Sequence, residues 1–330
     1  SPDGSRGLVL PYGGRVLGLF SAAGEENFFW THPALAAVET ARAFYQSGQW
    51  HNSGGDRTWL SPEVDLFFPE FPRLDTYWQP RQLDPGDYQV VTAEEGIGLN
   101  NRLQVKLSRS QKTLALEMIK WVGAAPNPLR HEKSWDGVDM EYAGYQLQTS
   151  LLVSGELNHG AQGGLWNLPQ MPHGGELLVP IYGRTVPRTF FGAIAPGELL
   201  MDHRLIRYRM GTAGEHKIGI RAVASTGRVG YRYEAQDRWA LVIRNFRVDP
   251  SGEYIDVPWG DPEDFGYSTQ ACNVNSALGS FSELEYHVPA IGAGNGKECL
   301  RCDDTSQVWA FRGSREQIDA AAAALLGVEE

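Results

Sequence analysis

Within the stretch Ser280–Ala290, with the sequence SFSELEYHVPA, residues 283–288 alternate polar and apolar side chains with a period of two. This alternation is typical of a β-strand, in which successive side chains point to opposite faces of a sheet. A strand here would set three polar side chains against two apolar ones: Glu283, Glu285 and His287 on one face, Leu284 and Tyr286 on the other. Because carboxylates are costly in a dry core, the polar face indicates either the lining of a cleft or charges that face solvent.

Similar short runs recur along most of the chain. The strand-like runs are 8–12, 15–20, 103–107, 114–118, 145–153, 176–181, 205–210, 217–222, 229–233, 239–248 and 307–312. The first two flank a Gly-Gly pair and the next two flank a turn at 108–111, which predicts two hairpins. Many short strands separated by turns predict an all-β, mainly antiparallel sandwich or barrel.

Two segments are expected to be helical. The Ala-rich segment from Pro33 to about Tyr45 has proline in its first turn, where proline is tolerated. The second runs from about 314 to 326: Ser314 and Gln317 form a capping box, and Gly327 ends the helix. We detect no repeat, linker or charge block, so the sequence predicts a single domain over residues 1–330 with few short helices, one of them C-terminal.

Charge and hydropathy limit the partners. The formal net charge of the 330 residues is −11, which disfavours nucleic acid and anionic membrane surfaces as ligands. No run approaches the roughly 20 apolar residues that a membrane span requires. The chain begins without methionine, so we expect a truncated or processed product. A periplasmic or secreted location is compatible with this start, a cytoplasmic one is not excluded by it, and the oligomeric state is left open.

The three cysteines do not form a disulfide framework. Cys299 and Cys302 make a C-x-x-C pair in a stretch that resembles a loop, but two further zinc ligands and a thioredoxin-like βαβ setting are missing from its surroundings. The pair is interpreted as a local disulfide or two free thiols. We therefore expect neither a metal nor a cofactor.

The stretch Gly54–Glu63, GGDRTWLSPE, combines two glycines with groups that suit a sugar. Arg57 offers a planar fork for bidentate hydrogen bonds, Trp59 a flat apolar plate, and Glu63 a carboxylate. The C–H faces of sugars stack on aromatic rings, while their hydroxyls need charged or amide partners. A structural Arg–Glu pair beside a core tryptophan is the competing interpretation.

Two further polar stretches could contribute to such a groove. Residues 163–175 combine glycines with Trp166, the amides of Asn167 and Gln170, and His173, and we expect a loop that enters a strand at residue 176. Residues 130–136 form a polar, loop-like run that contains His131. A histidine in such a loop is most often a solvated surface residue rather than a catalytic one.

At these motifs the chain resembles uncharacterised bacterial proteins of the galactose mutarotase-like, or aldose-1-epimerase-like, superfamily. The resemblance rests on the pattern Gly-Gly-x-Arg-x-Trp-x-x-Pro-Glu at 54–63, on Leu-Trp-Asn-Leu-Pro-Gln at 165–170, and on Glu-Leu-Glu-Tyr-His-Val-Pro at 283–289. It implies a large antiparallel β-supersandwich with a sugar site on the concave face of one sheet. The same fold carries mutarotases, epimerases, glycoside hydrolases and polysaccharide lyases, so it does not name the reaction.

The resemblance also implies roles for residues. The segment at 284–287 is similar to the one that carries the general base of mutarotases, which makes Glu285 the candidate base. In mutarotases a histidine in an Asn-His motif acts as the general acid, and the matching position in this chain is Gly163. An Asn-His pair does occur here, at 158–159, but it lies earlier in the chain than that position. The candidate acids are therefore His159, His131 and His173, and the candidate sugar-binding residues are Arg57, Trp59, Glu63, Trp166, Gln170 and Glu283.

Three functions remain open at this point, all with a mono- or oligosaccharide as the partner. The first is a mutarotase or epimerase that uses Glu285 and one histidine for proton transfer. The second is a polysaccharide hydrolase or lyase, with Glu63 and Glu285 as a carboxylate pair or with Arg57 neutralising a uronate. The third is a carbohydrate-binding protein without catalysis.

Overall fold

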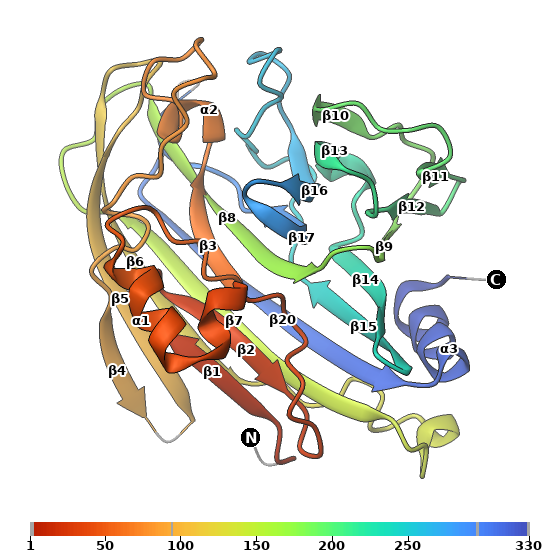
Figure 1. The fold of residues 1–330 in the computed structure, drawn as a ribbon. Helices are drawn as coiled ribbons and strands as arrows, with labels where there is room; N and C mark the ends of the chain where they lie inside the picture. Colours follow the sequence, from red (N-terminus) through yellow and green to blue (C-terminus); the bar gives the residue numbers. More distant parts are fainter. Residues whose placement is uncertain (1–2, 94, 295–296, 329–330) are drawn as a thin grey trace.

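Two stacked antiparallel sheets form most of the computed structural model, which describes residues 3–93, 95–294 and 297–328 (Figure 1). The first sheet has the spatial order β1 (Arg6–Leu10), β2 (Arg15–Phe20), β3 (Asp56–Ser61), β8 (Ala161–Pro172), β17 (Gly279–His287), β16 (Tyr267–Ser276), β13 (Gly214–Arg221) and β10 (Arg188–Phe191). Strand β18 (Ile291–Gly294) pairs with β8 and with β19 (Lys297–Cys299).

The second sheet has the order β11 (Leu199–Met201), β12 (Leu205–Arg209), β9 (Glu176–Pro180), β14 (Arg228–Ala235), β15 (Arg238–Asn245), β20 (Arg301–Gly313), β7 (Glu141–Val153), β6 (Thr113–Ala124), β5 (Gly96–Lys106) and β4 (Gln89–Ala93). The helical segments are short: η1 (Pro33–Ala36), α1 (Val38–Gln46), α2 (Glu63–Leu66), η2 (Lys133–Trp135), η3 (Ala222–Ala224) and α3 (Arg315–Leu326). The predicted all-β, mainly antiparallel supersandwich with a C-terminal helix is confirmed.

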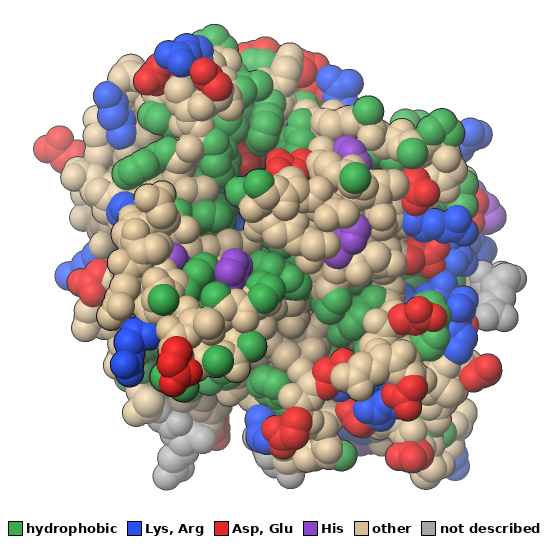
Figure 2. Space-filling model, viewed as in Figure 1, with side chains coloured by type: hydrophobic (Ala, Val, Ile, Leu, Met, Phe, Trp, Pro, Cys, Tyr) green, Lys and Arg blue, Asp and Glu red, His purple; other side chains and the backbone are tan. Residues whose placement is uncertain are grey.

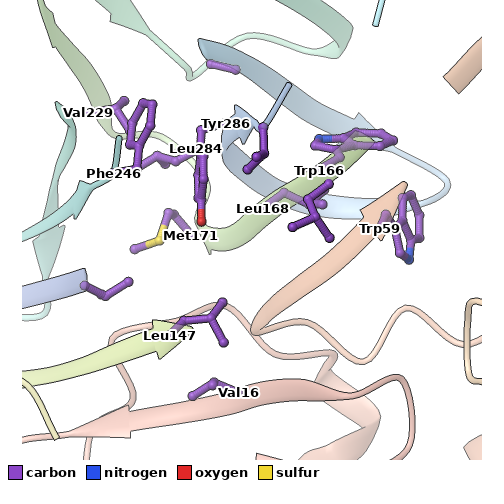
Figure 3. Close-up of a cluster of buried hydrophobic side chains, with 14 of the residues drawn as sticks. Val16, Trp59, Leu147, Trp166, Leu168, Met171, Val229, Phe246, Leu284 and Tyr286 are labelled. Atoms are coloured by element: carbon purple, nitrogen blue, oxygen red, sulfur yellow. The ribbon is translucent and has the colours of Figure 1, made fainter. Parts of the chain in front are cut away.

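The hydrophobic core fills the space between the two sheets (Figure 3). Leu284 and Tyr286 point into it from β17, and the Phe246 ring stacks on Tyr286 with centroids 4.4 Å apart. Leu147 on β7 belongs to the same cluster and is contributed by the opposite sheet. Each such side chain stabilises the fold by roughly 1.5–3 kcal/mol when it is fully buried, so the apolar face of β17 holds the two layers together.

The polar face of β17 points the other way, as the alternation in the sequence predicts. Glu283, Glu285 and His287 are 7%, 0% and 1% exposed, so this face is covered as well. The interpretation as a cleft lining therefore applies to Glu283 and Glu285, which line a pocket, whereas His287 is buried and does not line it.

The C-terminal helix begins and ends where the sequence predicts. Ser314 Oγ accepts from the Gln317 backbone N–H at 3.3 Å, and Gln317 Oε1 accepts from the Ser314 N–H at 2.7 Å. Gly327 has a φ of +66°, a left-handed conformation that suits glycine. The buried face of α3, which includes Ile318 and Leu325, packs against β15 and β14.

Three expectations about local structure are wrong: a continuous helix from 33 to 45, a loop at 163–175, and a loop around Cys299 and Cys302. The helix from Pro33 to Tyr45 is split into η1 and α1, because Ala37 adopts an extended conformation with φ −138° and ψ 149°. Residues 163–175 are largely strand rather than loop, since β8 continues to Pro172 at the centre of the first sheet. Glycine fits there because a Cβ on Gly164 would lie 2.9 Å from the Val288 carbonyl oxygen, which reflects close backbone packing.

The structure also resolves the state of these two cysteines and the expectation about membrane spans. Cys299 and Cys302 are free thiols, which selects one of the two alternatives left open by the sequence, and they lie in β19 and β20 rather than in a loop. Among the described helices, none is long and apolar enough to cross a membrane.

Candidate functional site

A row of polar side chains crosses the outer face of the first sheet. Strand register sets Gln170 on β8 opposite Glu283 on β17, Glu283 opposite Cys272 on β16, and Cys272 opposite Lys217 on β13. Because paired residues of neighbouring strands present their side chains on the same face, the four groups form one line. Glu285 lies on the same face, two residues further along β17.

Lys217, Cys272 and Glu283 of this row, together with Glu285, form the floor of a pocket of about 430 Å³. The lining includes six of the predicted residues: Arg57, Trp59, Glu63, Trp166, Glu283 and Glu285. It also includes residues that were not predicted: Trp50, Asn52, Phe68, Leu74, Tyr77, Gln79, Phe191, Glu215, Lys217, Trp259, Cys272, Val274, Leu278 and Phe281. Figure 2 shows hydrophobic side chains gathered in a hollow between the regions of α2 and β16.

Glu285 is fully buried, and its two oxygens have different surroundings. Oε2 accepts from Trp166 Nε1 at 2.7 Å and lies 3.0 Å from Lys217 Nζ, while Oε1 has no hydrogen-bond partner among the described residues. Burial raises the pKa of Glu285 to about 8, with Lys217 opposing the rise and Glu283 adding to it. A carboxyl whose pKa is raised in this way can hold a proton near neutral pH and donate it to a ligand.

Lys217 is the cation at the centre of the acidic cluster. Its Nζ lies 3.0 Å from Glu285, 3.5 Å from Glu63 and 3.9 Å from Asp256. Burial alone would lower the pKa of Lys217, but the three carboxyl groups outweigh it and raise this pKa well above its ordinary value. Burial also raises the pKa of Glu63, with Lys217 opposing the rise and Asp256 adding to it.

Glu283 is held differently from Glu285, although the two are close. Its Oε1 accepts from Arg57 Nη2 at 3.0 Å and from Gln170 Nε2 at 2.7 Å. Burial lowers the pKa of Arg57, and the ion pair with Glu283 opposes that effect. Gln170, a predicted sugar-binding residue, does not line the pocket but orients Glu283 from the neighbouring strand.

Trp59 and Trp166 support cations rather than offering open ring faces. They are 3% and 2% exposed. The Arg57 guanidinium carbon lies 3.9 Å from the centroid of Trp59, and Lys217 Nζ lies 4.2 Å from the centroid of Trp166. The His287 ring stacks on Trp166 at 5.7 Å. Desolvated cation–π contacts of this kind stabilise by roughly 2 kcal/mol, so these rings fix the two cations of the pocket.

Other aromatic rings that line the pocket are less deeply buried. Phe191 and Trp259 stack with centroids 4.2 Å apart, and Trp259 Nε1 donates to Glu63 Oε2 at 3.0 Å. Tyr77 is 39% exposed and lines the same pocket. These partly open rings are better placed than Trp59 or Trp166 to stack on a ligand.

The three histidines proposed as acids do not line the pocket. His131 and His159 are exposed on loops, before η2 and before β8 respectively. His173 is half-buried just after β8, where Nε2 lies 3.1 Å from Asn273 Oδ1. His287 is the buried histidine behind the floor: burial lowers its pKa to about 3, with Asp256 opposing, so it is neutral at physiological pH.

Of the pocket residues that were not predicted, some could have been found from the sequence pattern. Lys217 precedes Ile218 and Ile220 in a predicted strand, so its side chain had to lie on the face opposite to the apolar pair. Asp256 gave no such signal, since it follows no periodic pattern. It acts from a loop, where Oδ1 accepts from the Glu63 backbone N–H at 2.7 Å and Oδ2 accepts from Gln270 Nε2 at 3.0 Å.

One cluster has the ligand types for a metal. Cys272, Glu283 and Glu285 each offer a ligand atom, and these atoms lie within 4.8 Å of one another in the described part of the chain. A metal there would have to displace the Lys217 ammonium from Glu285. Burial also raises the pKa of the Cys272 thiol well above its ordinary value, and Glu283 adds to the rise, so the thiolate that metals need is disfavoured. We therefore assign no metal to this cluster.

Comparison with solved structures identifies the fold. A galactose mutarotase-like protein from Lactobacillus casei ATCC 334 is similar with a TM-score of 0.52 at 10% identity, over 93% of this chain and 97% of that one. A putative aldose 1-epimerase from Escherichia coli K12 is similar with a TM-score of 0.54 at 10% identity, over 94% and 97%. At this identity the likeness establishes a shared fold only.

Comparison of sequences gives the family. No curated protein matches the chain. The model of the family described as "Family of unknown function (DUF6786)" matches residues 8–330, which is nearly the whole sequence. The chain therefore belongs to this family of unknown function, and it has the galactose mutarotase-like fold.

Proposed function

We propose that this protein is a sugar-converting enzyme of the aldose 1-epimerase type, which interconverts the anomers of a sugar bound in the pocket. The observation that carries the proposal is the pair Glu283 and Glu285. The two carboxyl groups project from one strand into one pocket, with oxygens within 4.8 Å of each other, yet their surroundings differ. A pair of titratable groups in contrasting environments is the usual basis for acid and base roles.

The different surroundings of the two carboxyl groups indicate which one is the acid and which one is the base. Glu285 retains a proton because burial raises its pKa to about 8, which makes it the donor at neutral pH. Glu283 is an ion-paired acceptor, since Arg57 and Gln170 donate to it. Sequence reasoning made Glu285 the base and a histidine the acid, so the proposal reverses the role of Glu285 and replaces the histidine by a second carboxyl group.

The reaction then needs two coupled proton transfers. Glu285 donates its proton to the ring oxygen while Glu283 takes the proton of the anomeric hydroxyl, and the bond between the anomeric carbon and the ring oxygen breaks. The product is the open-chain aldehyde. After rotation about the bond between the first two carbons, the ring closes on the other face and both protons return to their donors. Lys217 and the Trp166 N–H stabilise the Glu285 carboxylate between the two steps.

The walls of the pocket support a sugar as the ligand. Trp259, Phe191 and Tyr77 are partly exposed aromatic rings of the pocket, on which the C–H face of a sugar ring can pack. The floor offers acidic groups that accept from hydroxyls. A lyase is less well supported, because Arg57 is already paired with Glu283 and is not free to neutralise a uronate.

A glycoside hydrolase is the second candidate. The Oε2 atoms of Glu63 and Glu285 lie 3.5 and 3.0 Å from Lys217 Nζ, so they are at most 6.5 Å apart, the sum of these distances. Retaining glycosidases hold their carboxyl groups about 5–5.5 Å apart and inverting ones about 6.5–9.5 Å apart. This bound favours the retaining type if the pair hydrolyses a glycoside.

The test measures anomer exchange by nuclear magnetic resonance on a panel of aldoses. We expect acceleration by the wild type and a loss of roughly 100-fold or more in Glu285→Gln and Glu283→Gln, which is typical for a removed acid or base. Glu25→Gln is the matched control, because this side chain is 89% exposed on the surface. Hydrolysis of aryl glycosides without anomer exchange would favour the second candidate, and binding without either reaction would leave a carbohydrate-binding protein.

A further inference from the structure

Two hydrogen-bond donors on the wall of the pocket have no acceptor. Trp50 Nε1 and Asn52 Nδ2 are buried atoms without a partner among residues 3–93, 95–294 and 297–328. Both residues line the pocket, and Asn52 is 6% exposed. A buried donor without a partner costs roughly 1–3 kcal/mol, so native proteins rarely retain one unless a ligand or water completes it.

The contacts of these two side chains fix which atoms are donors. Arg57 Nη1 donates to the side-chain amide of Asn52 at 3.0 Å, and arginine has no acceptor, so the amide oxygen must face Arg57 and the NH2 group must point elsewhere. The indole nitrogen of Trp50 can only donate. Its ring lies 5.9 Å from the Arg57 guanidinium carbon and 6.0 Å from the Trp59 ring, which holds it in the same wall.

The pocket is therefore divided by hydrogen-bonding type. The floor combines the carboxyl groups of Glu283 and Glu285 with the Lys217 ammonium, so it offers both acceptors and a donor to the hydroxyls of a sugar. The wall at residues 50–52 presents N–H groups alone, which suit an atom that accepts and does not donate. A carbonyl oxygen is such an atom, with two lone pairs and no proton. Leu74 and Tyr77 line the same pocket and offer apolar surface for a methyl group.

From this division we infer that the ligand is a sugar with an acyl substituent, an acetamido or acetyl ester group, whose carbonyl oxygen accepts from Trp50 and Asn52. The inference rests on the proposed function for the sugar itself and adds the class of sugar. It also gives the wall a role in specificity, because a site with buried donors rejects ligands that leave those donors unpaired.

The test is calorimetric binding of matched sugars. The probes are N-acetylglucosamine, N-acetylgalactosamine and 6-O-acetylglucose, each compared with its parent hexose. We expect an acyl sugar to bind at least about tenfold more tightly than its parent, the effect of one hydrogen bond to an otherwise unpaired donor. The amide and ester arms show which kind of acyl group the wall accepts.

Two variants distinguish the effect of the hydrogen-bond donors on binding from the effect of the shape of the pocket. Trp50→Phe keeps an aromatic ring but removes the N–H, and Asn52→Asp keeps an oxygen for Arg57 but removes the NH2. Each should reduce the preference for the acyl sugar, which is the ratio of its affinity to that of the parent hexose, roughly tenfold. Trp78→Phe is the matched control, because Trp78 is 48% exposed and does not line this pocket; it should leave the preference unchanged.

The outcomes distinguish this inference from the proposed function. Equal affinity for acyl and parent sugars, or a preference that persists in both variants, would overturn the inference and indicate that water completes the donors. Acceleration of anomer exchange could still be observed in that case. Tight binding of an acyl sugar without any conversion would support the inference and overturn the enzymatic proposal. Thermal unfolding of each variant, compared with the wild type, verifies that the fold is intact.

Discussion

Replacement of Glu285 by glutamine should change how the stability of the protein depends on pH. In the wild type the carboxyl is fully buried, Oε1 has no partner in the described chain, and burial raises the pKa from an ordinary value of 4.5 to about 8. Glutamine has nearly the same shape and can still accept from the Trp166 N–H through its amide oxygen, but it does not titrate. The variant therefore removes one titration while it preserves most of the packing.

The sign follows from the direction of the shift. A carboxyl whose pKa is higher in the folded state binds its proton more tightly there than in the unfolded chain. Its contribution to the free energy of unfolding is fully present below about pH 4.5 and is lost as the pH rises to about 8. The difference between 4.5 and about 8 corresponds to at most about 5 kcal/mol, at about 1.4 kcal/mol per pH unit.

The assay is urea unfolding of both proteins between about pH 5 and about pH 9. The Glu285→Gln variant should gain stability relative to the wild type as the pH rises, and the gap should stop growing above about pH 8. Glu63, whose pKa is also raised by burial, contributes a trend of the same sign in both proteins. The exposed control Glu25→Gln should show no such trend. A gap that stays constant across the range would refute the buried, protonated carboxyl.

Further predictions concern activity, the core and the C-terminal helix. The rate of anomer exchange by the wild type should fall as the pH rises through about 8, because Glu285 loses the proton that it donates; a rate that rises there would contradict this role. Asp56→Ala should reduce the free energy of unfolding by about 3–5 kcal/mol, measured in urea, because it leaves the buried Arg244 without its carboxylate at 2.7 Å. Ser314→Ala should cost about 1 kcal/mol in the same assay, and no change in stability would mean that the capping box contributes nothing.

The parts of the site that the sequence predicts are those set by local periodicity. The alternation around Glu285 is sufficient to place two glutamates and a histidine on one face, whatever the strand pairs with. The ends of α3 were predictable for the same reason, because the Ser314 capping box and the Gly327 cap involve only neighbours in the chain. Patterns among neighbouring residues therefore predict where strands and helices lie and which side chains share a face.

The parts that were not predicted depend on contacts between distant residues. Arg57 and Glu283 are 226 positions apart and meet because β3 and β17 both pair with β8. Periodicity does not reveal this order of strands. Glycines made β8 resemble a loop, although they serve close packing within a sheet. Tryptophan at positions 59 and 166 suggested sugar-stacking plates, but exposure is set by what covers a ring, here two cations and other aromatic groups.

Charge balance explains why this pocket can move protons at all. Four buried carboxyl groups, those of Glu63, Asp256, Glu283 and Glu285, lie close to two buried cations. The cations are Arg57 and Lys217. If all four were ionised, the cluster would carry two uncompensated negative charges away from water, which is strongly unfavourable. A proton retained on Glu285, the carboxyl with an unpartnered oxygen, reduces this excess. The same proton is the one that anomer exchange requires, so an additional cation placed beside Glu285 would stabilise the ionised site and weaken its function as an acid.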